Sequence, residues 1–343
     1  MEKYKNMYLA WIKNTSCPRL REELAVIEQD ASGIKDRFYK NLEFGTGGMR
    51  GIIGAGPNRM NIYTIRKATQ GLANYLNRHS PLGDNKVVIA FDSRHMSREF
   101  ALESALVLAR NNIKTYVFKE ITPTPLLSFA VRELRASAGI VITASHNPKE
   151  YNGYKVYNRH GGQITDELAH IITAEINNID DVFAIKIADR QEAEKQGLLV
   201  WIEDEILEKY LDITRRLLLN EDMVKDAASS LKIVYSPLHG TGLVPITRLF
   251  KQCGFTGLHV VERQALPDPE FPTVVCPNPE EEGACAMALQ AAQKLDADLI
   301  MLTDPDADRI GVVVKNENGQ YVQLTGNQVG ALLIDYILQM NEK

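Results

Sequence analysis

Short apolar runs alternate with amphipathic segments through most of the chain, which is the pattern typical of an α/β protein. Between residues 86 and 157, the runs VVIAF, KTYVF, GIVIT and GYKVY predict strands. Helices are predicted between them, over Glu99–Arg110 and from a start at Thr124-Pro125. We therefore expect a sheet flanked by helices, with polar loops at the carboxyl ends of its strands, where open α/β sheets bind ligands.

The second half of the chain repeats this order of elements. Strands are predicted at KIVYS, HVV, DLIMLT and GVVVK, and helices over Leu243–Cys253 and Ala284–Leu295. Ile140–Thr143 of the first block falls on Ile300–Thr303 of the second. Chance similarity of apolar runs is the alternative, but we interpret the pattern as an internal duplication. The predicted fold is a tandem repeat of α/β domains with mixed sheets flanked by helices.

The segments outside the two blocks complete the expected organisation. Residues 1 to about 40 predict amphipathic helices, and the stretch FGTGGMRGIIGAG that follows predicts no regular structure. Asp204–Leu219 predicts a helical linker, and VQLTGNQVGALLIDYIL after Gly319 predicts a further apolar helix. Because a third unit begins and the chain then stops, we expect a truncated piece of a longer protein. The predicted domains are 1–204, 205–320 and an incomplete 321–343.

Composition excludes several classes of protein. The 343 residues carry 39 Lys and Arg against 44 Asp and Glu, a net charge of −5, with no basic run that would track nucleic acid. No stretch predicts a signal peptide or membrane span, and the four cysteines lack metal-ligand spacing. We expect a cytoplasmic protein with reduced thiols that acts on small molecules and binds neither nucleic acid nor membrane. The oligomeric state stays open.

The loop Thr143–Pro148, with the sequence TASHNP, is the first candidate for chemistry. Ser145 follows a predicted buried strand in a turn-rich segment, so its hydroxyl would be exposed beside backbone N–H groups that can receive an anion. Lys155, on the next predicted strand, would supply a cation at the same strand ends. A plain Ser/Asn turn with His146 at the strand end is the alternative interpretation.

The loop Asp304–Arg309, with the sequence DPDADR, is the second candidate. On an extended chain, alternate carboxylates are roughly 6.6 Å apart at each step, too far for oxygens that must lie about 2.1 Å from one Mg²⁺. The loop must therefore curl for Asp304, Asp306 and Asp308 to share an ion. Oxygen ligands favour Mg²⁺ over Zn²⁺, and a solvated acidic turn is the alternative.

Two weaker candidates lie elsewhere. Gly45–Gly51 includes Arg50, a permanently charged donor suited to phosphate, in a stretch where glycines permit close backbone approach. Structural use of this stretch is an equal possibility. His239, in SPLHGTG, is more simply a core or turn histidine.

Together, TASHNP, DPDADR and GTGGMRG resemble the signatures of the α-D-phosphohexomutase superfamily, which includes phosphoglucomutases and phosphomannomutases. EITPTP, NGYKVY and DPEFPTV are most similar to its branch of phosphoglucomutases and phosphopentomutases. The resemblance implies an intramolecular phosphotransferase, an isomerase of carbohydrate metabolism. It would move a phosphoryl group between the 1 and 6 positions of a hexose through phosphoserine and a glucose 1,6-bisphosphate intermediate.

The resemblance also implies roles for the candidate residues. Ser145 would carry the phosphoryl group and, with Asp304, Asp306 and Asp308, hold Mg²⁺. Arg50 and Lys155 would lie near the transferring oxygens, with Lys155 as a candidate proton carrier. The phosphate or substrate would be oriented by His146 and Arg309, with Asp308 also at the substrate.

Three other readings of the sequence stay open. One is a phosphopentomutase of the same family. Another is a phosphatase of the haloacid-dehalogenase type, for which DLIMLTDPD would supply an Asp nucleophile, although that reading leaves Ser145 without a role. The last is a sugar-phosphate-binding fragment without activity. The family's sugar-selecting and second phosphate-binding loops have no counterpart in this sequence, so we expect low activity from the chain alone and cannot name its preferred sugar.

Overall fold

The computed structural model describes residues 3–79 and 85–341, and they form two compact units. The first unit consists of Met1–Glu120, Leu127–Ala144 and Glu150–Ile202. The second consists of Ile121–Leu126, Ser145–Lys149 and Glu203–Lys343. Two short loops of the first half of the sequence, one of them the TASHNP loop from Ser145 on, therefore belong to the second unit.

Three short helices open the first unit and pack into one apolar cluster. They are α1 (Lys3–Asn14), α2 (Pro18–Val26) and α3 (Ala31–Phe38). The ring of Trp11 makes edge-on contacts with Phe38, Tyr63 and Phe183. Aromatic burial of this kind stabilises a fold by more than its area alone, so the N-terminal helices are an integral part of the unit.

A six-stranded mixed sheet forms the centre of the first unit. Its strand order is β1-β5-β4-β2-β3-β6, with β1 and β5 antiparallel to their neighbours and the other strands parallel. The strands are β1 (Met49–Ile52), β2 (Lys86–Phe91), β3 (Lys114–Phe118), β4 (Ala138–Ile142), β5 (Tyr151–Asn158) and β6 (Leu199–Ile202). Because β4 is buried at every position, its five residues anchor the loop that follows them.

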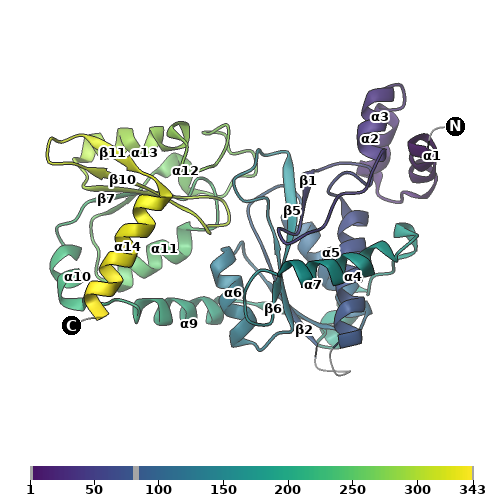
Figure 1. The fold of residues 1–343 in the computed structure, drawn as a ribbon, viewed down its shortest axis with the longest axis horizontal. Helices are drawn as coiled ribbons and strands as arrows, with labels where there is room; N and C mark the ends of the chain where they lie inside the picture. The colour runs from purple at the N-terminus through teal and green to yellow at the C-terminus, as the bar shows by residue number, and fades with distance from the viewer. Residues whose placement is uncertain (1–2, 80–84, 342–343) are drawn as a thin grey trace. The chain divides into compact units, whose positions relative to one another are not determined.

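Helices cover this sheet, and α4 packs against both α5 and α7 (Figure 1). The helices are α4 (Ile62–His79), α5 (Ser97–Arg110), α6 (Thr124–Glu133), α7 (Asp166–Asn177) and α8 (Arg190–Lys195), with a short 3-10 turn at Val182–Ala184. Gly71 allows α7 to approach closely, since a Cβ there would lie 2.3 Å from the Cγ1 atom of Ile176.

The second unit is built on a five-stranded mixed sheet of order β11-β10-β9-β7-β8. Figure 1 shows α13 on one side of these strands and α11 and α14 on the other. The strands are β7 (Ile233–Ser236), β8 (Leu258–Val260), β9 (Leu299–Thr303), β10 (Ile310–Lys315) and β11 (Tyr321–Leu324). The helices are α9 (Asp204–Arg215), α10 (Glu221–Ala228), α11 (Leu243–Gln252), α12 (Glu262–Ala265), α13 (Glu282–Leu295) and α14 (Gly326–Asn341).

The two sheets share one arrangement, which confirms the predicted repeat and the fold class. Each sheet contains three neighbouring parallel strands, β3-β2-β4 in the first unit and β8-β7-β9 in the second. In each, the next strand, β5 or β10, pairs antiparallel with the last of the three. The TASHNP loop leaves β4 and the DPDADR loop leaves β9. The two candidate loops therefore occupy equivalent positions in the two copies.

Some sequence predictions need correction. The stretch FGTGGMRGIIGAG is partly regular, because Gly48 adopts a left-handed φ of 75° that turns the chain so that β1 can pair with β5. The first residues assigned to a third domain form β11, which pairs with β10 and completes the second sheet. Helices α4 and α7 were not predicted. Among the described residues, no helix is both long and apolar enough to cross a membrane, and none of the four cysteines forms a disulfide.

The close approach at Gly71 gives a stability prediction. Gly71→Ala would force α4 and α7 apart, since the added carbon also lies 2.9 Å from the Ile176 backbone nitrogen. We expect a loss of about 1–3 kcal/mol in the free energy of unfolding, as for other overpacked cores, measured by urea denaturation. Gly283→Ala in α13, where nothing lies within 4 Å of the added Cβ, is the matched control and should not destabilise. Equal stability of both variants would contradict the packing described for α4.

Candidate active site

The backbone turns sharply at Ser145, just after the strand that precedes it. Thr143 and Ala144 continue the buried chain after β4, and Ser145 then adopts a φ of 52°, in the left-handed region that few residues other than glycine occupy. A serine held there is strained by about 1–3 kcal/mol, a cost that clusters at functional sites. The turn directs the Ser145 side chain into the second unit, where only 2% of the residue is exposed.

The Ser145 hydroxyl has two close polar neighbours. Its Oγ donates a hydrogen bond of 2.5 Å to Oδ2 of Asp304 and lies 3.1 Å from Nδ1 of His146. The arrangement places the Ser145 hydroxyl directly against the first residue of the DPDADR loop.

The DPDADR loop curls as the sequence analysis required. One carboxylate oxygen from each of Asp304, Asp306 and Asp308 lies within 4.8 Å of the others, with the first two residues buried and the third exposed. Oδ1 of Asp304 accepts backbone N–H bonds from Asp308 at 3.2 Å and Arg309 at 3.1 Å, and Ala307 takes a φ of 49°. The loop therefore wraps around the Asp304 carboxylate.

Two neighbouring segments hold the loop in this shape. The Thr124 N–H donates to the Asp306 carbonyl at 2.9 Å, and the Thr124 hydroxyl donates to Oδ2 of Asp306 at 3.1 Å. On the other side, the Thr241 N–H donates to the Pro305 carbonyl at 2.8 Å. Gly240 permits this approach, because a Cβ there would lie 2.4 Å from the Pro305 Cα. His239 is buried and bonded to the Leu266 carbonyl and the Thr273 hydroxyl, which is a structural role.

The electrostatics of the loop favour a bound cation. Burial, together with the neighbouring carboxylates of Asp306 and Asp308, raises the pKa of Asp304 to about 9, although the Ser145 hydrogen bond partly opposes the rise. Three acids held so close in a buried loop repel each other unless a proton or a cation compensates. The set consists only of hard oxygen donors, so these residues fit a divalent cation such as Mg²⁺.

Arg50 and Lys155 lie together in the first unit. Strands β1 and β5 pair with Arg50 opposite Gly153, so Lys155, two residues further along β5, shares the face of Arg50. The Gly153 carbonyl accepts a hydrogen bond from the Thr143 N–H at 3.2 Å. A Cβ at position 153 would lie 2.5 Å from the Thr143 carbonyl oxygen, so glycine is needed there for this close approach. Lys155 is buried and Arg50 is exposed.

Sequence reasoning missed a buried polar cluster at the end of β2. Oδ1 of Asp92 accepts bonds from the Ser97 hydroxyl at 2.7 Å and the Arg94 N–H at 3.0 Å. Burial raises the pKa of Asp92, and the neighbouring guanidinium of Arg94 opposes that rise. Asn152 of β5 donates to the Ser97 hydroxyl at 3.0 Å, which ties the cluster to the strand that carries Lys155. The sequence DSR after the apolar run VVIAF was the available signal.

Comparison with known proteins agrees with this fold. Residues 41–183 match the sequence model of "Phosphoglucomutase/phosphomannomutase, alpha/beta/alpha domain I", and residues 208–319 match that of domain II. The chain therefore belongs to the phosphoglucomutase/phosphomannomutase family, within the α-D-phosphohexomutase superfamily.

The individual relatives that this chain matches are longer than the chain. It is 41% identical over 303 residues to a phosphoglucomutase of Staphylococcus haemolyticus, covering 88% of this chain and 54% of that protein. It is 37% identical to a phosphoglucomutase of Staphylococcus saprophyticus, covering 96% of this chain and 58% of that protein. A crystal structure of a putative phosphomannomutase from Thermus thermophilus superposes with a TM-score of 0.73 at 26% identity, over 88% of this chain and 62% of that one. The chain thus spans little more than half the length of these curated relatives.

The acidic loop gives a direct test of cation binding. Titrated with MgCl₂ in a calorimeter, the chain should bind one ion, and Asp306→Asn should weaken binding by about tenfold or more, the size of loss expected from damage to a metal site. Asp226→Asn, on the exposed surface of α10, removes the same charge elsewhere and should leave the affinity unchanged. Unaltered affinity in Asp306→Asn would reduce the loop to a plain acidic turn.

Proposed function

We propose that this chain carries the phosphoryl-transfer machinery of a phosphosugar mutase, which moves a phosphoryl group between the 1 and 6 positions of a hexose. The observation that supports this most is the Ser145 hydroxyl held 2.5 Å from the Asp304 carboxylate of a cation-binding loop. Relatives named phosphoglucomutase support the same reaction class. Under this proposal, Ser145 holds the group while a bisphosphorylated sugar, such as glucose 1,6-bisphosphate, reorients.

A serine ester suits this task because the group must survive while the sugar turns over. Phosphate monoesters are among the slowest compounds to hydrolyse, whereas an acyl phosphate on Asp304 would be labile. Burial of Ser145 excludes further water from the ester. The hydrogen bond to Oδ2 of Asp304 holds the unmodified hydroxyl in position beside the acidic loop.

The negative charge that collects at this site suggests roles for the remaining residues. Asp304, Asp306 and Asp308 would hold Mg²⁺, which would neutralise charge on the transferring phosphate. Phosphoserine adds about −1.5 to −2 near neutral pH to a loop already carrying three acids. We assign Arg50, Lys155 and Arg309 to offset this charge, His146 to orient the phosphate through Nδ1, and Lys155 to move a proton on the sugar oxygen. Catalysis then depends mainly on positioning and electrostatic stabilisation.

The proposed intermediate has a distinct chemical signature. Incubated with glucose 1,6-bisphosphate and MgCl₂, the chain should gain about 80 Da, the mass of one phosphoryl group replacing a hydrogen. Peptide mapping should place the group on Ser145, stable to neutral hydroxylamine. Ser145→Ala should abolish the gain, and Ser230→Ala, an exposed serine after α10, should not.

Two results would overturn the assignment. Phosphate on Asp304, released by hydroxylamine as an acyl phosphate, would make the protein a phosphatase of the haloacid-dehalogenase type. Phosphorylation that persists in Ser145→Ala at another serine would remove Ser145 from the reaction altogether.

A further inference from the structure

The segment that carries Ser145 is joined to the first unit at both of its ends. The chain leaves that unit after Ala144 and returns to it at Glu150, so Ser145–Lys149 is a loop with both ends in one sheet. The first end follows β4, and the second leads into β5, which pairs antiparallel with β4. The position of the Ser145 hydroxyl therefore depends on what holds these two ends.

The buried cluster at the end of β2 holds the first end. The parallel register pairs Phe91 of β2 with Ile142 of β4, and the Asp92 N–H donates to the Ile142 carbonyl at 3.1 Å. Asp92 therefore lies beside Thr143, whose side chain donates a hydrogen bond to the Asp92 carboxylate. Because Thr143 is only two residues before Ser145, this bond restrains the chain directly ahead of the serine.

The same cluster holds the second end. Nη1 of Arg94 donates to the Tyr151 carbonyl at 3.2 Å. Nδ2 of Asn152, the next residue of β5, donates to the His95 carbonyl at 2.8 Å. The stretch of residues 92–97 is thus bonded to the chain on both sides of the loop.

Two opposite charges are buried in this cluster. The side chains of Asp92 and Arg94 are fully buried, with Nε of Arg94 3.5 Å from Oδ2 of Asp92. Replacing a buried ion pair with apolar side chains is often neutral or stabilising, because both charges lose their hydration on burial. Stability alone therefore gives no reason for this pair, whereas hydrogen bonds in fixed directions to both ends of a loop do.

The second unit restrains the equivalent position in a similar way. Thr303 corresponds to Thr143 in the repeat and directly precedes Asp304. Its hydroxyl lies 2.9 Å from the buried hydroxyl of Tyr235 in β7. In both copies, a buried polar side chain from the middle of the three parallel strands, or from the residue after it, bonds the threonine at the start of the candidate loop.

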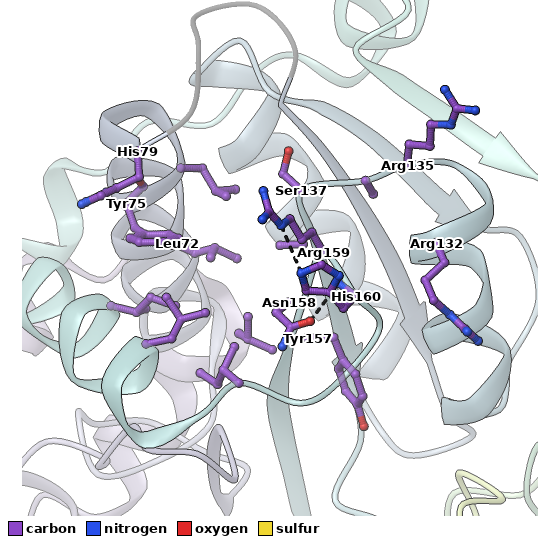
Figure 2. A pocket seen from close by; sticks show the side chains of 17 residues that line it. Leu72, Tyr75, His79, Arg132, Arg135, Ser137, Tyr157, Asn158, Arg159 and His160 are labelled. Atoms are coloured by element: carbon purple, nitrogen blue, oxygen red, sulfur yellow. Dashed lines mark hydrogen bonds between the residues drawn. The ribbon is translucent and has the colours of Figure 1, made fainter.

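A neighbouring cavity does not account for the buried charges. A cavity of about 770 Å³ in the first unit lies toward the opposite end of β4 and β5, where Figure 2 shows Tyr157 and Asn158 in its lining. It meets β4 at Ala138, at the start of the strand, whereas Asp92 lies beside the chain that leaves the end of β4. Neither Asp92 nor Arg94 is among the residues that line it.

We propose that Asp92 and Arg94 are positioning residues, which hold both ends of the Ser145–Lys149 loop and so direct the Ser145 hydroxyl toward the transferring phosphorus. This inference rests on the proposed function, in which Ser145 carries the phosphoryl group. The left-handed conformation of Ser145, with a φ of 52°, persists only where the surrounding structure over-determines it. Without the pair, the ends of the loop would relax and the serine would leave the reactive position.

The rate of Ser145 phosphorylation in a single turnover tests this role. In Asp92→Asn, incubated with glucose 1,6-bisphosphate and MgCl₂, the rate constant at saturating bisphosphate should fall by about tenfold to a hundredfold, the loss expected from a small misplacement of reacting groups. The bisphosphate concentration that gives half the maximal rate and the affinity for Mg²⁺ should stay close to those of the unaltered chain. The reason is that the acidic loop is held by Thr124 and Thr241 instead.

Two further variants separate positioning from stability. Thr143→Val removes the bond to Asp92 and leaves the ion pair in place, so it should fold and still slow phosphorylation at saturating bisphosphate. Glu103→Gln is the control, because it breaks an ion pair with Arg66 that joins α5 to α4 and contacts neither end of the loop. It should lower the free energy of unfolding, measured with urea, without slowing phosphorylation.

Two outcomes would contradict a positioning role. One is an unaltered rate of phosphorylation in Thr143→Val and, where it folds, in Asp92→Asn, which would make the cluster a contributor to stability only. The other is slowing of the same size in Glu103→Gln, which would mean that any loss of stability in this unit slows the reaction. If the unaltered chain is not phosphorylated on Ser145 at all, the proposed function is wrong, and this inference with it.

Discussion

The hydrogen bond between Ser145 Oγ and Asp304 Oδ2 joins the TASHNP and DPDADR loops, on which the candidate active site depends. The residues are 159 positions apart in the sequence, yet the oxygen atoms are 2.5 Å apart and both residues are buried. A buried carboxylate beside two further acids is costly unless its charge is compensated. The proposed divalent cation at Asp304, Asp306 and Asp308 would supply this compensation.

Duplication of one sheet explains how these loops come to be equivalent. Each copy places a polar loop after the strand that pairs with both a parallel and an antiparallel neighbour, β4 in one copy and β9 in the other. Both loops contain a residue other than glycine with positive φ, Ser145 at 52° and Ala307 at 49°. One copy carries a serine in this loop and the other carries three acids, so the repeated sheet places two different sets of side chains at equivalent positions.

The local chemistry of the loops was predictable from sequence, because acids at alternate positions and a serine after a buried strand are short-range signals. Their contacts were not. The left-handed turn at Ser145 and the bonds from Thr124 to Asp306 depend on segments far apart in the sequence. The strand β1 was hidden because it contains Gly51 and follows a glycine-rich stretch, and glycine has a low strand propensity; in the structure it pairs with β5.

Two other features were missed. Ile65, Ala68, Leu72 and Leu76 of α4 are buried and recur at helical spacing, so a local signal for this helix was present, but the contact with α7 that requires Gly71 was not readable from it. The cluster of Asp92, Arg94 and Ser97 is completed by Asn152, which belongs to another strand. In both cases tertiary contacts, rather than local preference, determine the role of the residue.

Phosphorus NMR of the chain carrying phosphate on Ser145 tests whether that phosphate and the acidic loop share one cation. As MgCl₂ is added, the account predicts that the phosphoserine resonance shifts and saturates over the concentration range in which the chain binds the ion. The shift should be lost in Asp306→Asn and retained in Asp226→Asn. A resonance that does not move at saturating Mg²⁺, or that moves equally in both variants, would contradict the central claim that Ser145 and Asp304, Asp306 and Asp308 form a single site.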